Sequence, residues 1–364
     1  MNFTRFGRPA VIAVVAALAL SSCAANEAAP AASDAATASA LTGTLTGAGS
    51  SAQGSAQEAW IAAFQTANPD VTVNYDPSGS GAGRATFIAG GSDFAGSDSY
   101  LKDEELAGTF AACAPTGKAV DLPVYISPIA VIFNVEGVKD LNLDSPTLAK
   151  IFKGDITTWN DPAIAALNPK ATLPTTAITA VHRSDDSGTT KNFSDYLNQT
   201  APDVWTEKPG DPFPYQTGEG AKGTSGVVDA VTNGTGTIGY ADASRAGKLG
   251  VAKIKVGDKF VGYTAEAAAA VVAESPLVEG RDASDLAIKV DRLTTDPTHY
   301  PLVLVSYALV CTEYAKPAQG ELVKAYVSYM AGTDGQSVAA SAGGAAPLSA
   351  DLADKVAAVL ESIK

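Results

Sequence analysis

The chain has 364 residues, of which 39 are acidic and 25 basic, and its formal net charge is −14. This balance argues against a nucleic-acid partner, which normally requires a basic face, but it leaves open a small anion, which responds to local dipoles and donors. Only two histidines occur, and no Cys or His pair has the spacing of metal ligands, so we expect neither a metal nor a cofactor.

The N-terminal segment has the order of an export signal. Arg5 and Arg8 precede an uninterrupted apolar run, Val11 to Leu20, which is too short to span a bilayer. The run ends in Leu-Ser-Ser-Cys, which resembles the lipobox of bacterial lipoproteins, where the cysteine (here Cys23) is lipidated and becomes the first mature residue. An ordinary signal peptide with a chance cysteine is the alternative.

We therefore predict a lipoprotein signal peptide at 1–22 and a disordered tether at 23–40. The tether is almost entirely Ala, Ser, Thr and acidic residues, which bury too little apolar surface to offset the entropy of ordering. Lipid on Cys23 would hold the protein to the cell membrane, outside the cytoplasm. The two remaining cysteines, Cys113 and Cys311, form an even pair in an oxidising compartment, where a disulfide is the default expectation.

From residue 41 onward the pattern alternates between strands and helices, which implies mainly parallel sheets flanked by helices. About 320 residues remain beyond the tether, and this length suggests two lobes because single cores stop growing near 250–300 residues. Pro128 lies inside a long apolar run and indicates a bend or an edge. Strands are expected near 41–46, 71–75, 93–96, 124–135, 178–182, 238–241 and 302–310, and helices near 56–64, 147–152, 162–167, 188–197, 227–231, 265–273, 316–331 and 348–363.

Three Gly/Ser/Thr turns stand between an expected strand and an expected helix: Gly47–Ser51, Ser78–Gly83 and Asp186–Thr190. Each would present free backbone N–H groups and hydroxyls at a helix N-terminus, which suits an anion. A single turn of this kind is more often an ordinary cap. Three of them in one chain, with Arg183 just ahead of the last, favour an anion site.

Arg183 is the cation that we assign to this site, because its planar fork can bond two oxygens of a tetrahedral anion. A surface ion pair with Asp185 or Asp186 is the alternative. The glycine-rich stretch Gly218–Gly226 lacks the ending of a phosphate-binding P-loop, so we interpret it as a turn and helix cap. Trp159 is interpreted as a packing or surface residue.

At four segments the sequence resembles the PstS-type phosphate-binding proteins, the substrate-binding lipoproteins of ABC phosphate importers. The resemblance extends from about Leu41 to the C-terminus. The four segments are LTGAG at 45–49, DFAGSD at 93–98, IFKGDITTWNDPAIAALNP at 151–169 and RSDDSGTT at 183–190.

The resemblance implies an α/β fold of the two-lobed, periplasmic-binding-protein-like type II class, with lobes joined by crossover strands. It places the crossings near 122–126 and 300–302. Lobe I would then comprise 41–122 with 302–364, and lobe II would be 123–301.

The resemblance also implies a function: a monomer, not an enzyme, that binds inorganic phosphate with high affinity and delivers it to the permease subunits of the importer. In this chain Ser51 stands where the family usually has Thr, and Ala52 stands where an aromatic residue often follows. Ala52 keeps its backbone donor. Carried over position by position, the phosphate-binding residues are Ser51, Ala52, Ser80, Asp98, Arg183, Ser187, Gly188 and Thr189.

Asp98 is the informative member of this set. A carboxylate that faces a bound anion repels it, unless the anion brings a proton to share. Phosphate carries a proton near neutral pH and sulfate does not, so Asp98 favours phosphate. A helix cap is the alternative role for this residue.

Two other functions stay open from the sequence. A receptor for another tetrahedral oxyanion would use the same donors, and Asp98 argues against it. An exported phosphatase would need a nucleophile with a base or clustered metal ligands; the G-x-S-x-G elbow is missing and the two histidines lie far apart in sequence.

Overall fold

The computed structural model describes residues 41–364. The signal peptide, Cys23 and the tether expected at 1–40 lie outside the described residues. Among residues 41–364, no helix combines the length and the apolar character that a membrane crossing requires. The same residues contain no group of three or more His, Cys, Asp or Glu side chains arranged to hold a metal ion.

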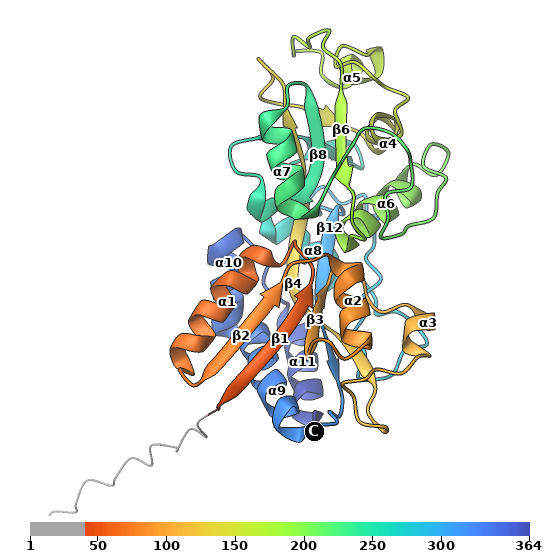
Figure 1. The fold of residues 1–364 in the computed structure, drawn as a ribbon. Coiled ribbons are helices and arrows are strands. Elements are labelled where there is room, and N and C mark those ends of the chain that lie inside the picture. The colour runs from red at the N-terminus through yellow and green to blue at the C-terminus, as the bar shows by residue number, and fades with distance from the viewer. Residues whose placement is uncertain (1–40) are drawn as a thin grey trace, which may run out of the picture. The chain divides into compact units, whose positions relative to one another are not determined.

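The predicted α/β class is confirmed, but the main sheet is mixed rather than mainly parallel, because β12 and β4 run antiparallel to their neighbours. Its nine strands, in the order β2-β1-β3-β12-β4-β8-β6-β7 with β9 paired to β4, are flanked by helices (Figure 1). A separate three-stranded sheet has the order β11-β10-β5. The strands are β1 Gly43–Gly49, β2 Val71–Asp76, β3 Phe94–Ser97, β4 Ala119–Asn134, β5 Asn142–Leu143, β6 Thr179–Arg183, β7 Glu219–Ala221, β8 Thr237–Asp242, β9 Gly250–Val251, β10 Lys253–Val256, β11 Lys259–Val261 and β12 Val303–Cys311.

The long strand β4 belongs to both ends of the sheet. Its residues 119–128 pair antiparallel with β12, and its residues 129–134 pair antiparallel with β8. The partner changes after Pro128, which has no N–H to donate to a ladder. We call β2, β1, β3, β12 and β4 up to Pro128 the first half-sheet, and β4 from Ile129 onward with β8, β6, β7 and β9 the second half-sheet.

Parallel pairing is found away from β4 and β12: β1 pairs in parallel with β2 and β3, and β6 pairs in parallel with β7 and β8. β4 is buried along all but its last residue, and β12 along its whole length. Helices cover both faces here, which explains why these strands read as continuous apolar runs rather than alternating ones.

The helices follow the apolar spacing of the sequence. On α1, Ala56, Trp60 and Phe64 face the core, and the Trp60 indole donates to the Gly335 carbonyl at 2.7 Å. The helices are α1 Gly54–Ala67, α2 Ser80–Ile88, α3 Asp103–Leu106, α4 Ser145–Lys153, α5 Pro162–Leu167, α6 Gly188–Thr200, α7 Gly223–Asn233, α8 Ala265–Ala273, α9 Pro317–Ala331, α10 Thr333–Gly343 and α11 Ala350–Ser362.

Two differences from the sequence prediction matter. The stretch Gly218–Gly226 contains the short strand β7 before the start of α7, so it is more than a turn and a cap. Helix α10 was not predicted, because its sequence TDGQSVAASAG has few large apolar residues to mark a buried face. Trp159 is fully buried and its indole donates to the Gly236 carbonyl at 3.0 Å, which makes it a core residue.

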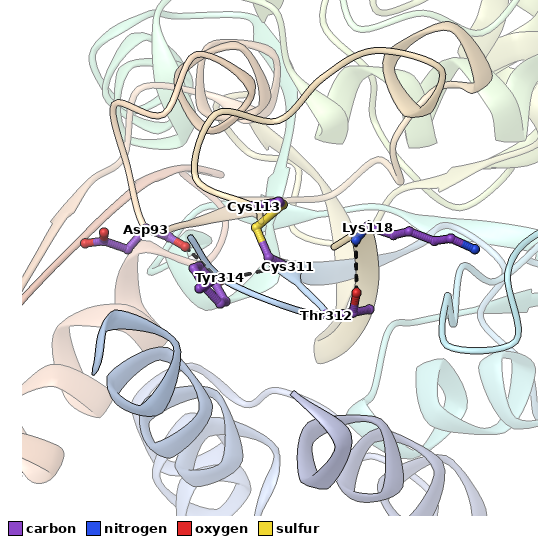
Figure 2. Close-up of a disulfide and its surroundings, with 6 residues drawn as sticks. All are labelled: Asp93, Cys113, Lys118, Cys311, Thr312 and Tyr314. Atoms are coloured by element: carbon purple, nitrogen blue, oxygen red, sulfur yellow. Dashed lines mark hydrogen bonds between the residues drawn. A yellow bond between two sulfur atoms is a disulfide. The ribbon is translucent and has the colours of Figure 1, made fainter. Parts of the chain in front are cut away.

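A disulfide joins Cys113, in the loop after α3, to Cys311 at the end of β12, with their Cα atoms 5.3 Å apart. Figure 2 shows that hydrogen bonds surround it. The Tyr314 hydroxyl accepts from the Cys311 N–H at 3.2 Å and donates to the Asp93 carbonyl at 2.9 Å. The link therefore ties the loop after α3 to the end of β12, an inner strand of the first half-sheet.

Candidate functional site

Three helix N-termini meet at Asp98, the residue that follows β3. Its carboxylate accepts hydrogen bonds from Ser50, which precedes α1, at 2.5 Å and from Thr189, in the first turn of α6, at 3.0 Å. Its backbone N–H donates to the hydroxyl of Ser80, the first residue of α2, at 3.1 Å. Asp98 thus connects elements of the first half-sheet with the start of α6.

A fourth helix, α7, reaches the site through Ser51. The Thr224 N–H donates to the Ser51 hydroxyl at 3.1 Å, and the two hydroxyls also lie 3.1 Å apart. The Ala52 N–H donates to the Ser50 hydroxyl at 3.1 Å. The turn Gly47–Ser51 therefore lies against the N-terminus of α7, where backbone N–H groups and the helix dipole favour negative charge.

The Asp98 carboxylate is held by hydroxyl groups. One oxygen, Oδ1, accepts from Ser50 at 2.5 Å and from Ser306 of β12 at 2.6 Å. The other, Oδ2, accepts from Thr189 at 3.0 Å. Burial raises the pKa of Asp98 above its ordinary value, while the three hydroxyl donors and the charge of Arg183 oppose that rise.

Arg183 lies at the end of β6 and is 3% exposed, so it is not a surface residue. Its Nε donates to Asp185 Oδ1 at 2.7 Å and its Nη2 donates to Asp185 Oδ2. The Gly223 N–H also donates to Asp185, at 2.9 Å. Although burial alone would raise the pKa of Asp185, the hydrogen bonds and charge of Arg183 hold it below the ordinary value. Asp185 therefore orients the guanidinium, and Asp186 is the exposed neighbour.

The start of α6 lies directly against α2 and β3. Ser187 caps the helix, accepting from the Thr190 N–H at 3.2 Å. A Cβ on Gly188 would lie 2.7 Å from the Ser80 hydroxyl and 2.8 Å from the Asp98 Cβ, so this close approach requires glycine. The motif residues Ser187, Gly188 and Thr189 are all buried.

The structure brings Ser51, Ser80, Asp98, Gly188 and Thr189 together through these contacts. Ser187 belongs to the same helix start, and Arg183 lies close enough to influence the charge of Asp98. Ala52 sits beside them with its N–H on Ser50. The disulfide cysteines lie apart from this cluster, in the loop after α3 and at the end of β12.

Sequence reasoning missed Ser50, Ser306, Gly223 and Thr224. Ser50 is the neighbour of an expected residue, and Gly223 and Thr224 lie in a stretch interpreted as a plain cap. The sequence does hold a signal for Ser306: in the buried run LVLVSYALV, only this serine and the tyrosine beside it carry a hydroxyl. Its partner Asp98 is 208 positions away, and no local pattern predicts such a pairing.

The arrangement offers hydroxyls, helix N-termini and one oriented arginine, together with a single acceptor carboxylate. It has no serine activated by histidine: the His182 ring contacts the Arg183 carbonyl at 2.9 Å and stacks on Phe213, and the His299 ring contacts Thr294 at 2.9 Å. Such a set binds a tetrahedral oxyanion that can also donate a proton.

Comparison with known proteins gives a consistent result. Residues 34–334 match the model of the PBP superfamily domain. The chain is 38% identical over 277 residues to "Phosphate-binding protein PstS 3" of Mycobacterium leprae, covering 74% of this chain and 73% of that protein. It is 35% identical over 312 residues to "Phosphate-binding protein PstS 2" of Mycobacterium tuberculosis, covering 84% and 83%.

Solved structures share the fold. A high-affinity periplasmic phosphate-binding protein (PfluDING), solved with phosphate bound, superposes with a TM-score of 0.72 at 22% identity, over 87% of this chain and 93% of that one. A putative phosphate ABC transporter substrate-binding protein from Clostridium perfringens superposes with a TM-score of 0.58 at 20% identity, over 84% of this chain and all (100%) of that one.

Proposed function

The chain belongs to the PstS-type phosphate-binding proteins of the PBP superfamily, and from this premise we propose that it binds inorganic phosphate and delivers it to the permease of an ABC importer. The binding residues are Ser51, Ala52, Ser80, Asp98, Arg183, Ser187, Gly188 and Thr189. The curated relatives are named as binding proteins, and we assign no catalytic step to this chain.

One observation carries the choice of ligand. Asp98 is a buried carboxylate, 4% exposed, placed among helix N-termini and hydroxyls that otherwise suit an anion. A buried charge is costly unless enough donors satisfy it. Here Oδ1 accepts two hydroxyl protons but Oδ2 only that of Thr189, at 3.0 Å, so Oδ2 can take a further donor. A ligand that combines negative charge with a proton supplies what both sets of groups need, and monohydrogen phosphate is such a ligand.

Ligand exchange requires the two half-sheets to move apart, because the site residues come from both. We assign residues 41–122 with 302–364 to lobe I, which holds the first half-sheet except residues 123–128 of β4. Lobe II (123–301) holds those residues, which cross between the lobes, and the second half-sheet. β4 and the start of β12 act as the hinge. Closing brings Thr189 to Asp98 and Thr224 to Ser51, and the closed form is the one that the permease subunits recognise.

The location follows from the N-terminal pattern. We place the protein outside the cytoplasm, as a monomer attached to the cell membrane by lipid on Cys23. The tether at 23–40 separates the anchor from the binding lobes. Replacement of Cys23 by serine is then expected to release the protein without changing its affinity for phosphate.

Calorimetric titration of the ligand-stripped protein with phosphate, sulfate and arsenate tests the proposal. Phosphate and arsenate, which both carry a proton near neutral pH, should bind, and sulfate should not. Binding of sulfate at an affinity comparable to that of phosphate would instead indicate a general oxyanion receptor. Hydrolysis of a phosphomonoester by the purified protein, with or without divalent metals, would indicate a phosphatase.

A further inference from the structure

A line of buried side chains leads through the core of the first half-sheet to Asp98. The Tyr326 hydroxyl of α9 donates to Gln57 Oε1 at 2.8 Å, and Gln57 Nε2 donates to Gln53 Oε1 at 2.9 Å. Gln53 Nε2 then donates to the Ser306 hydroxyl at 2.7 Å, and Ser306 donates to Asp98 Oδ1 at 2.6 Å. Each of these donors is at most 2% exposed.

The direction of this line is fixed by groups that can act in only one way. Gln53 Nε2 also lies 3.2 Å from the Tyr307 carbonyl, which can only accept, so the nitrogen of that amide must face Ser306. Ser306 therefore accepts from Gln53 and has its one proton left for Asp98. Each donor in the line points toward the carboxylate, and aligned hydrogen bonds polarise and strengthen one another.

Ser50 is constrained in the same way. Its hydroxyl accepts from the backbone N–H groups of Ala52 at 3.1 Å and Gln53 at 3.2 Å. Its own proton is then directed to Asp98 Oδ1 at 2.5 Å. Oδ1 thus receives two hydroxyl protons, whereas Oδ2 receives only that of Thr189.

We propose that Ser306 and Ser50 are specificity-determining positioning residues. They occupy Oδ1 of Asp98, so that Oδ2 is the oxygen that accepts the proton of the bound anion. The line Tyr326–Gln57–Gln53 fixes the direction in which the Ser306 hydroxyl donates. The inference rests on the phosphate site proposed above. It adds the residues that keep Asp98 a pure acceptor. A protonated Asp98 would carry its hydrogen on Oδ2 and could donate it to sulfate, which would abolish the discrimination.

Charged and titratable groups on other elements also act on Asp98. Arg183 at the end of β6 favours its ionised form, while Asp242 at the end of β8 and Tyr75 of β2 interact with its negative charge. Burial raises the pKa of Asp98, and the hydrogen bonds from Ser306 and Ser50 oppose that rise. Removing either hydroxyl while leaving Arg183 and Asp242 in place therefore isolates the effect of Oδ1.

The test is the ratio of phosphate to sulfate affinity as a function of pH, measured by calorimetry on ligand-stripped protein between pH 8 and pH 5. The preference for phosphate is lost at low pH, when Asp98 becomes protonated. In the Ser306→Ala protein the pH of this loss should rise by about one to two units, because one hydrogen bond to the charged carboxylate has been removed. Ser50→Ala should shift it in the same direction. Gln53→Leu, which touches neither Asp98 nor the ligand, should give a smaller shift of the same sign.

Two controls make the result specific. Ser306→Thr keeps the hydroxyl and should restore the wild-type profile. Ser92→Ala removes a buried hydroxyl that has no hydrogen-bond partner among the described residues and should leave the profile unchanged. Circular dichroism shows whether each variant is folded. If Ser306→Ala does not fold, the pH profiles of Ser50→Ala and Gln53→Leu test the proposal.

The outcomes separate this inference from the proposed function. If the wild type binds phosphate selectively and the folded Ser306→Ala and Ser50→Ala proteins show the same pH profile, the positioning role is wrong while the phosphate site stands. If the wild type binds no phosphate, or binds sulfate equally well at pH 8, the proposed function itself fails. The solution conditions affect the titration of phosphate equally in every variant, so differences between variants report on Asp98.

Discussion

The two sides of the candidate site are built from opposite chemistry. On the side of the first half-sheet, Ser50, Ser306 and Asp98 form a cluster of hydroxyls around a carboxylate, and hydroxyls rather than a cation contact that carboxylate. On the side of the second half-sheet, a carboxylate is also present, but Asp185 is bonded in two places to Arg183.

This difference explains how each side acts on an anion. The charge of Asp185 is already used in holding Arg183, so the second side presents a net donor. The charge of Asp98 is stabilised by neutral donors, so the first side presents an acceptor. A ligand with both negative oxygens and a proton satisfies the two sides together, and the first two predictions below each remove one side.

The largest expected effect comes from removing the acceptor. A site built on one hydrogen bond to the ligand can reject an analogue that lacks it by roughly 10⁴–10⁵. Asp98→Asn should lose most of this discrimination between phosphate and sulfate, because an amide can accept from phosphate or turn to donate to sulfate. Phosphate affinity should fall much less. Paired titrations with phosphate and sulfate measure both, and a variant that still excludes sulfate as strongly would make Asp98 a helix cap.

Removing the donor side should weaken binding itself. Charge-assisted hydrogen bonds contribute about 1.5–3 kcal/mol each, and the Arg183 fork can make two, so Arg183→Ala should lower phosphate affinity by two orders of magnitude or more. The loss leaves Asp185 without its cation, which adds repulsion. Arg245→Ala is the control, since among residues 41–364 Arg245 pairs with the exposed Glu58 alone, at 3.4 Å. If the Arg183→Ala protein binds phosphate with the affinity of the wild type, the site is misplaced.

The two sides also differ in how far the sequence predicts them. Most of the expected donors of the second side lie within one short motif, from Arg183 to Thr190, which local turn and cap chemistry predicts. Gly223 and Thr224, at the start of α7, were not predicted. On the first side, Ser80 and Ser50 lie in turns that the sequence marks, although Ser50 itself was not among the expected residues, and Asp98 lies in the segment 93–98 that resembles the family. Ser306 lies in no such turn, because it reaches Asp98 only through the pairing of β12 with β3 and β4.

The same reason explains the elements that sequence patterns miss. Periodicity predicts β4, β12 and α9, whose apolar residues mark their buried faces. It cannot predict α10, whose small residues pack closely against α1, nor the short strand β7, which is defined by its parallel register with β6. Tertiary contact rather than local preference determines these elements.

A third difference between the two halves is covalent. All cysteines of the described residues belong to the link between Cys113 and Cys311, at the end of β12 in the first half-sheet. A cross-link between residues 198 positions apart restricts the unfolded chain strongly, by roughly 3–5 kcal/mol in the entropic account. Replacing both cysteines by alanine should lower the free energy of unfolding by that amount and leave phosphate affinity within a few-fold of wild type.

Urea denaturation and calorimetry of the double variant measure these two quantities. Wild-type protein in reductant is the matched comparison and should show the same loss of stability. Peptide mass spectrometry without reduction should find Cys113 and Cys311 linked. Two free thiols in the protein as isolated would contradict the prediction.

The smallest expected effect concerns Asp242, a buried carboxylate that, like Asp98, is held by neutral donors. Tyr125 donates to its two oxygens at 3.1 and 3.2 Å, and the Ser244 N–H donates at 2.9 Å. Burial raises the pKa of Asp242 to about 6. Because the unfolded chain releases this proton more readily than the folded one, stability should fall as pH rises from about 4 to 6, by about 3 kcal/mol, and the cost is complete above pH 6.

Asp242→Asn keeps an acceptor for Tyr125 and Ser244 but removes the ionisation, so it should stabilise the protein at pH 7.5 and change little at pH 4. Thermal unfolding at the two pH values measures the difference. The Arg183–Asp185 pair has the opposite sign: the lowered pKa of Asp185 stabilises the fold above the unfolded value and is lost as the pH falls. Loss of the negative charge of Asp242 favours the ionised, accepting form of Asp98, so phosphate selectivity at pH 7.5 should be kept in Asp242→Asn, which makes this protein the matched control for Asp98→Asn. If the Asp242→Asn protein is no more stable than wild type at pH 7.5, the donors to Asp242 fully offset the cost of burying its charge. Neutral donors would then suffice to ionise Asp98 as well.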